Sequence, residues 1–550
     1  MKLKHIALSL IGAGLTLASC ELDEKFYSEA SPDTFYTSPE NVYSILGRPF
    51  YQISYIWEQK WIWVQEEMTS DEMTAPAQGK DFYNNGEYVR CQEHTLTPDE
   101  RIIFNPYNQI GYIMARAFEA REDLSGINYT ALGLTDQDKA DHINQLNCVV
   151  AHAYMLYLNQ YGGVPIYESS QDAPKPRNTA KEVFDYIEKL LKDAIPQIKA
   201  KEDGASQTGY ITKGGAVMML AKLYMNAEAY TGEKRFAEAQ TLLEDLIAGK
   251  YGKYDLDKTW YGPHSFTNDQ SPEAVWNIPS EKNKFEPMGW YYRFSYISGA
   301  DVYFDCAFPG SRYNGYMLSP SRETPDGPIY EDKMGCPYEK FHAKDLRKKP
   351  YFYKGNGEYE GMFCVGLQQN PRTGKIAIGT RGDCSGLEMV MVDCINADGK
   401  GSHMLNGAEN SGVRLVKTPI PNTADIDMLF NPDIPMYRLT HAYYWLAECY
   451  WRDGKGAQAA ALINKVRTRN FEGGVDPDPV PDNFDIYRLS DEYMIEFLGE
   501  GQRRTDLIRL GLFTTESWWA HKPSGKDKAL FPIPTDAITA NPLLEQNPGY

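Results

Sequence analysis

Apolar and small residues recur at spacings of three and four over residues 435–470, which predicts two amphipathic helices. Asp453-Gly454 separates them, because glycine tolerates the left-handed backbone that ends a helix. The order of bulky, small and aromatic positions matches tetratricopeptide repeats, in which small residues let two antiparallel helices approach closely. The apolar faces are marked by Tyr443, Leu446, Ala447 and Tyr450 in the first helix and by Ala459, Ala460, Ile463 and Val466 in the second.

The same periodicity extends through the N-terminal half of the chain. Leu220, Ala221, Tyr224 and Ala239 repeat the tetratricopeptide-like set of positions. Because such pairs need neighbours to bury their apolar faces, we expect them to stack. The predicted fold class is therefore mainly α: a tetratricopeptide-like helical-pair scaffold that begins with an N-terminal helical region at residues 20–250. The helices are predicted at residues 40–63, 105–121, 136–161, 179–195, 213–227 and 235–248.

The composition changes near Tyr251, and from there to residue 431 the chain is rich in Gly, Pro, Tyr, Asn and Asp. Apolar runs are short there, which predicts loops, short helices and few strands. So much irregular chain inside a compact protein usually has a function. We expect residues 251–431 to be a loop-rich, strand-poor insertion that carries the ligand side, within a C-terminal region covering residues 251–550.

Residues 490–550 contain helix-boundary signals. Ser490 is a suitable N-cap, and the two acidic residues after it suit the positive end of a helix dipole. Gly499 and Gly501 are expected to end that helix. Asp506 and Arg509 can pair at i,i+3 in a short helical turn that follows.

Three runs in this segment carry a family resemblance: EFLGEGQRRTDLIRLG, PIPTDAITANP and the terminal QNPGY. They resemble the C-terminal signature of the SusD/RagB family of outer-membrane nutrient-binding lipoproteins. Weaker similarities occur at residues 161–165, 211–214, 345–347 and 438–439. The chain differs from the family at Thr440 and His441, where an acid is usual, and near Tyr493, where an arginine is usual; both positions look structural.

The resemblance implies a cell-surface protein that binds a nutrient glycan and passes it to a SusC-like TonB-dependent outer-membrane barrel. An oligosaccharide is the usual ligand, and RagB-type relatives take peptides. The signature residues Arg503, Asp506 and Arg509 are expected to be structural. The alternative to a binding protein is an enzyme, a surface glycoside hydrolase that uses carboxylates within residues 251–431.

The first 19 residues are predicted to be a lipoprotein signal peptide, with Lys2 and Lys4 before an apolar segment at residues 6–17. That segment is too short to span a bilayer. It ends in Leu17-Ala18-Ser19-Cys20, which resembles a bacterial lipobox, so Cys20 is the predicted lipid-attachment residue. The alternative is a simple signal cleaved near Ala18. The expected location is the outer membrane, lipid-anchored and facing the exterior.

Composition excludes several other classes. The formal net charge of −19 makes nucleic acid and anionic membrane surfaces poor partners. Nine cysteines include no CxxC pair, which disfavours a zinc ribbon or a thioredoxin site. No HExxH, P-loop or nucleophile elbow occurs, and the acidic run at 475–485 lacks the EF-hand order. We therefore predict no catalytic residue, no metal and no cofactor.

Aromatic residues make up 13% of the chain, with 39 tyrosines, most of which we assign to the helical core. Residues 289–299, GWYYRFSYISG, are the strongest ligand candidate, because sugar rings stack on aromatic planes and hydroxyls bond to polar side chains. A buried aromatic strand is an equally good interpretation. The candidate ligand residues in this run are Trp290, Tyr291, Tyr292, Arg293 and Tyr296.

A polar loop with aromatic residues at 69–88 is the second ligand candidate. It contributes Asp71, Phe82, Tyr83 and Asn84 to the predicted site. Because an extended polymer must lie across the protein, we expect the 69–88 and 289–299 loops to form one shallow, largely preformed surface.

Overall fold

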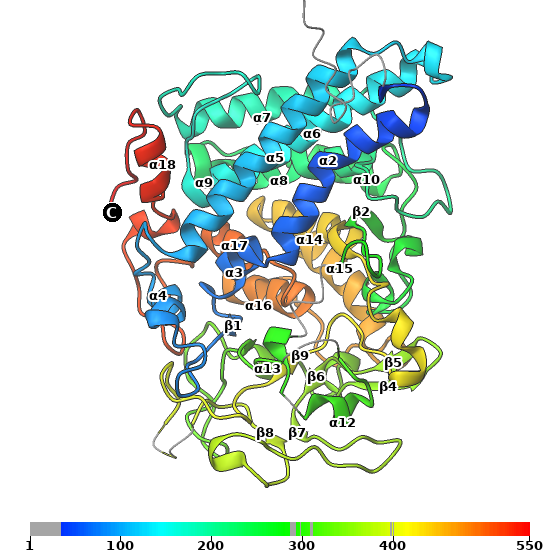
Figure 1. The fold of residues 1–550 in the computed structure, drawn as a ribbon. Helices are drawn as coiled ribbons and strands as arrows, with labels where there is room; N and C mark the ends of the chain where they lie inside the picture. The colour runs from blue at the N-terminus through cyan, green and yellow to red at the C-terminus, as the bar shows by residue number, and fades with distance from the viewer. Residues whose placement is uncertain (1–34, 287–292, 298, 309–311, 397–398, 400) are drawn as a thin grey trace, which may run out of the picture.

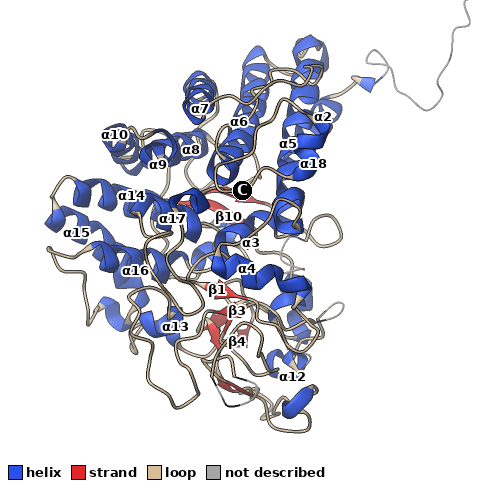
Figure 2. Ribbon diagram, turned by 90° about the vertical axis from the view of Figure 1, so that its left-hand side faces the viewer, coloured by secondary structure: helices blue, strands red, loops and turns tan. Residues whose placement is uncertain are grey.

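The computed structural model describes residues 35–286, 293–297, 299–308, 312–396, 399 and 401–550. Helices fill the upper part of the molecule in Figure 1, and the loop-rich insertion forms the lower part. Figure 2 shows most of the short strands within this lower part. The mainly α fold with few strands is as the hydrophobic pattern predicts. The N-terminal helices are α2 (Pro39–Glu58), α3 (Trp61–Glu67), α4 (Glu87–Glu93), α5 (Arg101–Gly126), α6 (Asp136–Tyr161), α7 (Ala180–Ala194), α8 (Lys213–Met225), α9 (Ala227–Thr231) and α10 (Phe236–Ile247).

Capping residues explain where the N-terminal helices begin. Thr135 and Thr179 each accept a hydrogen bond from the backbone N–H three residues later, at the starts of α6 and α7. In both cases an acidic residue, Asp138 or Glu182, bonds back to the capping residue and completes a capping box. The predicted ranges of 136–161 and 179–195 therefore match the observed helices closely.

The stack of helical pairs continues from the N-terminal half into the C-terminal half. Helix α10 packs on α8 and also on α14 (Leu439–Arg452), which in turn packs against α15 (Gly456–Arg467). The predicted apolar face of α15 is buried, which confirms the tetratricopeptide-like pair. One core cluster runs through both halves of the chain. The remaining C-terminal helices are α16 (Ile486–Phe497), α17 (Arg503–Leu510) and α18 (Thr535–Ala540).

Two predicted helix boundaries are wrong. The 40–63 segment is not one helix, because Lys60 has a left-handed backbone (φ 62°) between α2 and α3. Helix α16 begins after Asp485, whose carboxylate accepts the Arg488 N–H, rather than at Ser490. Ser490 lies inside the helix and is buried, where its carbonyl and hydroxyl oxygens accept hydrogen bonds from Arg503.

The insertion leaves and rejoins the helical scaffold through one antiparallel ribbon, in which Ile434 of β10 pairs with Ile278 of β2. Strand β10 leads directly into α14, so the ribbon anchors the base of the insertion. The other sheets of the described chain are also two-stranded. The strands are β1 (Met73–Thr74), β2 (Ala274–Ile278), β3 (Met317–Leu318), β4 (Phe352–Gly355), β5 (Glu358–Glu360), β6 (Phe363–Cys364), β7 (Gly366–Leu367), β8 (Val390–Met391), β9 (Arg414–Leu415) and β10 (Ile434–Arg438), with short helices α12 (Ala300–Phe304) and α13 (Pro337–Lys340) between them.

Two absences hold for the described part of the chain. None of its helices is long and apolar enough to cross a membrane. Its eight cysteines are all unpaired, and Cys148 and Cys449 are buried in the core.

The YGG motif at the end of α6 joins the C-terminal tail to the helical scaffold. The carbonyl oxygen of Tyr161 accepts hydrogen bonds from Arg177 and from the amide of Asn547. Gly162 takes a positive φ of 79° to end the helix. Gly163 lies directly against the backbone at residues 178–180.

A methyl group added at Gly163 tests this close approach. A Cβ there would lie 2.1 Å from the carbonyl oxygen of Asn178, which is backbone and cannot swing away. We expect Gly163→Ala to lower the free energy of unfolding by about 1–3 kcal/mol, measured by urea denaturation. Gly126→Ala is the control, because a Cβ at that last residue of α5 meets nothing within 4 Å. Equal stability of the two variants would contradict the packing constraint.

Candidate functional site

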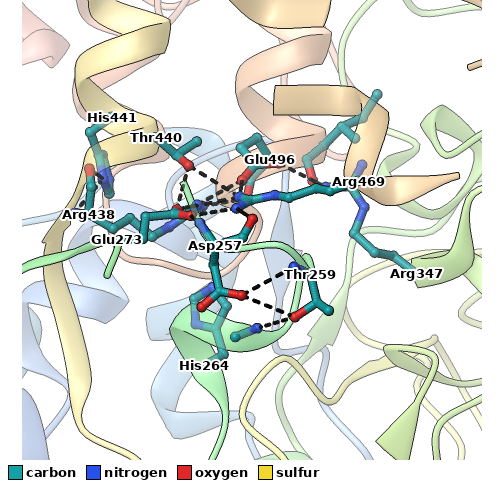
Figure 3. Close-up of polar contacts among 12 residues, drawn as sticks. Asp257, Thr259, His264, Glu273, Arg347, Arg438, Thr440, His441, Arg469 and Glu496 are labelled. Carbon is teal, nitrogen blue, oxygen red and sulfur yellow. Dashed lines mark hydrogen bonds and ion pairs between the residues drawn. The ribbon is translucent and has the colours of Figure 1, made fainter. Parts of the chain in front are cut away.

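A buried network of ion pairs lies where the insertion meets the helical scaffold (Figure 3). Arg438, at the junction of β10 and α14, lies 2.7 Å from Glu496 of α16 and 3.0 Å from Glu273. Arg469 bonds to both glutamates, and Arg347 binds the other oxygen of Glu496 at 3.0 Å. Side chains from five separate segments therefore meet at one point.

Electrostatics keep these glutamates ionised. Burial alone would raise their pKa values, but the attraction of the arginines outweighs it. The pKa of Glu273 falls to about 2 beside Arg469 and Arg438, and that of Glu496 falls to about 2 beside Arg438, Arg469 and Arg347. A general acid for glycoside hydrolysis needs a raised pKa and access to substrate, and neither glutamate has them.

One departure from the family pattern, at Thr440 and His441, lies at this network. The Thr440 hydroxyl donates a hydrogen bond to Glu273. The His441 ring stacks on Phe497 with ring centroids 4.4 Å apart, and burial lowers its pKa to about 3. Both side chains are fully buried, so the substitutions change internal packing.

The signature residues also form buried pairs. Asp506 and Arg509 pair at 2.7 Å, as their i,i+3 spacing predicts. Arg503 instead reaches Asp71, with its Nε 2.7 Å from one carboxylate oxygen and a second bond of 3.0 Å to the other. This position corrects the prediction for Asp71: its side chain is fully buried, and Arg503 holds its pKa below the usual range despite the opposing effect of burial.

Metal binding is not indicated by the described residues, which contain no group of three or more His, Cys, Asp or Glu side chains able to hold an ion. The acidic run at 475–485 is partly committed to protein contacts. Asp476 pairs with Arg467 at 2.6 Å, so this carboxylate is held by the protein itself.

An exposed aromatic surface forms where the two predicted ligand loops meet. Phe82 packs edge-on against Phe294 with ring centroids 6.0 Å apart. Phe294 also lies 5.2 Å from the Tyr313 ring and is stacked 5.2 Å from that of Tyr316. Phe82 and Tyr316 are buried and Phe294 is partly buried, and these three rings form the base. Tyr313, which packs on Phe294, is 41% exposed, and Tyr83, next to Phe82 in the chain, is 48% exposed. We call the exposed surface around Tyr83 and Tyr313 the aromatic platform.

Backbone contacts hold the platform in shape. The N–H groups of Tyr313 and Gly315 donate to the carbonyl oxygens of Arg293 and Phe294, each at 2.6 Å. A Cβ at Gly315 would lie 1.9 Å from the Phe82 ring, so only glycine permits this approach. The 312–316 segment therefore bridges the two predicted loops.

Charged groups border the platform. Asp81 pairs with Arg381 at 2.9 Å, and both side chains are substantially exposed. The Arg381 backbone N–H donates to Glu409 at 2.8 Å, which fixes the start of that loop. The Asp81 carboxylate and the Arg381 guanidinium can each form hydrogen bonds to hydroxyl groups of a ligand in place of some of the bonds between them.

The predicted ligand residues divide into three groups. Tyr83 and Asn84 are exposed at the platform, and Arg293 is half-buried at its edge. Phe82 is buried and belongs to the base. Tyr296 is buried in the core, where its hydroxyl donates to the Leu415 carbonyl at 2.8 Å and its ring packs on Phe304. Trp290, Tyr291 and Tyr292 lie outside the described residues.

Sequence reasoning missed three residues of this surface, Asp81, Tyr313 and Arg381. The run RYNGY at 312–316 has the Tyr, Asn and Gly composition that drew attention to the other two loops, and that signal could have found Tyr313. Nothing in the sequence near Asp81 or Arg381 indicates that these two side chains pair.

Comparison with known proteins identifies the family. The sequence profile of the SusD family matches residues 272–550, which include the ion-pair network and the C-terminal signature. The chain belongs to the SusD family. This confirms the resemblance inferred from the signature motifs.

Curated SusD-type relatives match at low identity over most of the chain. Starch-binding protein SusD of Bacteroides thetaiotaomicron is 24% identical over 450 residues, covering 76% of this chain and 74% of the relative. A SusD-like protein of Formosa agariphila is 22% identical over 579 residues and covers all of both chains.

Solved structures share the fold. Surface glycan-binding protein A from Bacteroides thetaiotaomicron, solved in complex with laminarihexaose, has a TM-score of 0.66 at 16% identity and covers 93% of this chain and 100% of that one. NanU of B. fragilis has a TM-score of 0.68 at 15% identity and covers 95% and 99%.

Neutralising Glu496 tests whether the ion-pair network is structural. Glu496→Gln leaves three arginines short of a buried charge, so we expect the free energy of unfolding to fall by about 3–5 kcal/mol. The folded-state pKa near 2 lies below the ordinary value of 4.5, so this stabilisation is present above about pH 4.5 and is lost as the pH falls toward 2. Urea denaturation of the unmodified protein and of Glu496→Gln should show that the difference between their free energies of unfolding becomes smaller as the pH is lowered from 4.5 toward 2. The exposed Glu472→Gln is the control, and a Glu496→Gln protein as stable as that control would contradict a structural role.

Proposed function

We propose that this SusD-family protein binds an oligosaccharide on the aromatic platform. The observation that carries the proposal is the exposed Tyr313 ring packed on the aromatic base, together with the exposed Tyr83, which is next to Phe82 of that base in the chain. Flat aromatic rings suit the C–H faces of sugar rings, while Asp81, Asn84 and Arg381 offer polar groups for hydroxyls. Affinity from such a wet, open surface is expected in the micromolar to millimolar range, on the order of −8 to −4 kcal/mol.

The names of two relatives support a carbohydrate ligand. One is a starch-binding protein, and the other is a glycan-binding protein solved with laminarihexaose. Trp290, Tyr291 and Tyr292 immediately precede Arg293 in the chain and stay predicted ligand residues. A peptide ligand of the RagB type is the alternative within the same family.

We also propose that the protein is anchored in the outer membrane through acylated Cys20 and passes its ligand to a SusC-like TonB-dependent barrel. The anchor proposal rests on the Leu17-Ala18-Ser19-Cys20 junction after a short apolar run. The partner proposal rests on family membership alone. The hydrolase alternative predicts turnover, so purified protein incubated with a bound glycan should release new reducing ends if it is correct.

Removing the exposed rings separates ligand binding from folding. A glycan array that includes laminarihexaose and maltohexaose identifies the ligand, and isothermal titration with that glycan measures affinity. We expect Tyr83→Ala and Tyr313→Ala each to weaken binding by about 1–3 kcal/mol, because each removes a stacking surface. Thermal unfolding should stay close to that of the unmodified protein, since both side chains are largely exposed.

Tyr51→Ala is the matched control for this measurement. Tyr51 is 56% exposed on α2, outside the platform, and its removal should leave glycan affinity unchanged. If both platform variants bind as tightly as the Tyr51 variant, the glycan site lies elsewhere. If no glycan binds but a peptide does, the RagB-type alternative is correct.

Anchor and partner can be tested in the native membrane. Cys20→Ala should move the protein from the outer-membrane fraction to the soluble fraction, because the thiol that carries the acyl chains is gone. Pull-down of the unmodified protein from detergent-solubilised membranes should recover a large TonB-dependent receptor. Retention of Cys20→Ala in the membrane, with no labelled fatty acid on the unmodified protein, argues against the anchor. Recovery of the protein without a receptor argues against the partner.

A further inference from the structure

The aromatic platform and its charged border are built from three segments that are far apart in the sequence. They are residues 78–83, 312–316 and 380–381, and none of these described segments belongs to a helix or a strand. Secondary structure therefore does not set their relative positions. Contacts made by side chains and by single backbone groups have to do so.

The buried carboxylate of Glu409 holds the 380–381 segment. One of its oxygens accepts hydrogen bonds from the backbone N–H groups of Thr380 at 2.7 Å and of Arg381 at 2.8 Å. Its other oxygen accepts from the Thr380 hydroxyl at 2.9 Å. Hydrogen bonds to a charged acceptor are stronger than those between neutral groups, so these three bonds fix the point from which the Arg381 side chain extends.

The backbone of Glu409 is bonded to Asn314, the neighbour of Tyr313. Asn314 Nδ2 donates to the Glu409 carbonyl oxygen at 2.8 Å and to Gln78 Oε1 at 3.3 Å, while Arg414 donates to Asn314 Oδ1 at 2.6 Å. Asn314 is buried and has a left-handed backbone, with φ at 60°. Such a conformation persists in a residue other than glycine where its surroundings determine it. Glu409 therefore joins the segment of Tyr313 to that of Arg381.

Glu409 is placed to act on a ligand only through other residues. Its side chain is 4% exposed, and both of its carboxylate oxygens accept hydrogen bonds from the protein. The side chains of Tyr313 and Arg381 are partly exposed instead. A glycan on the platform would therefore contact these two side chains and not the carboxylate.

We propose that Glu409 is a positioning residue of the aromatic platform, which holds Arg381 at a fixed place relative to Tyr313 so that both contact the same glycan. This inference rests on the proposed function of the platform. A surface arranged before binding loses less conformational entropy than a loop that the ligand itself must order. Removal of the Glu409 carboxylate should therefore weaken glycan binding, although the glycan does not touch it.

Limited proteolysis tests the hold on the 380–381 segment without any ligand. Trypsin cleaves after arginine, and a segment held in place is cleaved only when it opens locally. We expect Glu409→Ala to speed cleavage between Arg381 and Gly382 by about tenfold, measured by mass spectrometry, because three hydrogen bonds are lost. Glu409→Gln keeps an acceptor oxygen and should restore most of the resistance. Cleavage at other sites should not change.

Asp425→Ala is the matched control for the proteolysis. Asp425 is also a carboxylate of the insertion that accepts hydrogen bonds from a side chain and a backbone N–H, those of Tyr353 and Asn356. Neither partner belongs to the platform. The Asp425 variant should therefore be cleaved after Arg381 at the rate of the unmodified protein.

Isothermal titration with the glycan identified on the array tests the effect on binding. Glu409→Ala should weaken binding by about tenfold, and Glu409→Gln by less than about threefold. Because the carboxylate acts through Arg381, Glu409→Ala should weaken binding by less than about twofold more in a protein that already carries Arg381→Ala. A residue that only stabilises the fold would give the same loss with and without Arg381. Asp425→Ala should bind as the unmodified protein does.

The outcomes separate this inference from the proposed function. If Tyr313→Ala weakens binding and Glu409→Ala does not, the platform is correct and the role of Glu409 is wrong. If Tyr313→Ala binds as tightly as the unmodified protein, both proposals fail. Unchanged cleavage after Arg381, or a full further loss in the Arg381→Ala protein, would also overturn the role of Glu409. If Glu409→Ala does not fold, Thr380→Ala decides, because it removes one of the three bonds and should change cleavage and affinity by about twofold in the same directions.

Discussion

The buried pairing of Arg438 with Glu273 and Glu496 is the interaction on which the rest of the structure depends. Arg438 ends β10, Glu273 precedes β2, and those two strands form the ribbon through which the insertion leaves and rejoins the scaffold. Breaking one such pair leaves an uncompensated buried charge, which costs more than the pair contributes by itself. The main effect of these charged side chains is therefore to specify where the insertion meets α16, and their net contribution to stability is smaller.

Local signals predicted the helices well where local contacts decide their limits. Helix α6 begins at its Thr135 cap and ends at Gly162, and both signals can be read within a few residues. Ser490 misled the prediction for α16 because its oxygens bond to Arg503, which belongs to the next helix. A cap and a buried contact use the same short polar side chain, and only the tertiary structure distinguishes them.

The candidate site was predictable in its loops but less so in its residues. Phe82 and Tyr83 are adjacent in sequence, yet Phe82 packs beneath Gly315 and Tyr83 is exposed. Asp71 was chosen as a polar residue in the same loop, and its burial follows from Arg503. Each outcome depends on a partner hundreds of residues away, so neither composition nor spacing near these residues could reveal it.

The platform's base connects it to the family signature. Tyr316 of the base lies 5.4 Å from the Trp63 ring of α3, and Trp63 Nε1 donates to the carbonyl oxygen of Gly499 at 2.8 Å. The Phe82 and Tyr316 rings of the base are therefore part of the core, and folding fixes their positions. Tyr313 packs against Phe294 of this base, so its ring has less conformational freedom to lose if a ligand stacks on it. Substitutions in the base would alter folding and binding together, so only the exposed tyrosines can report on binding by itself.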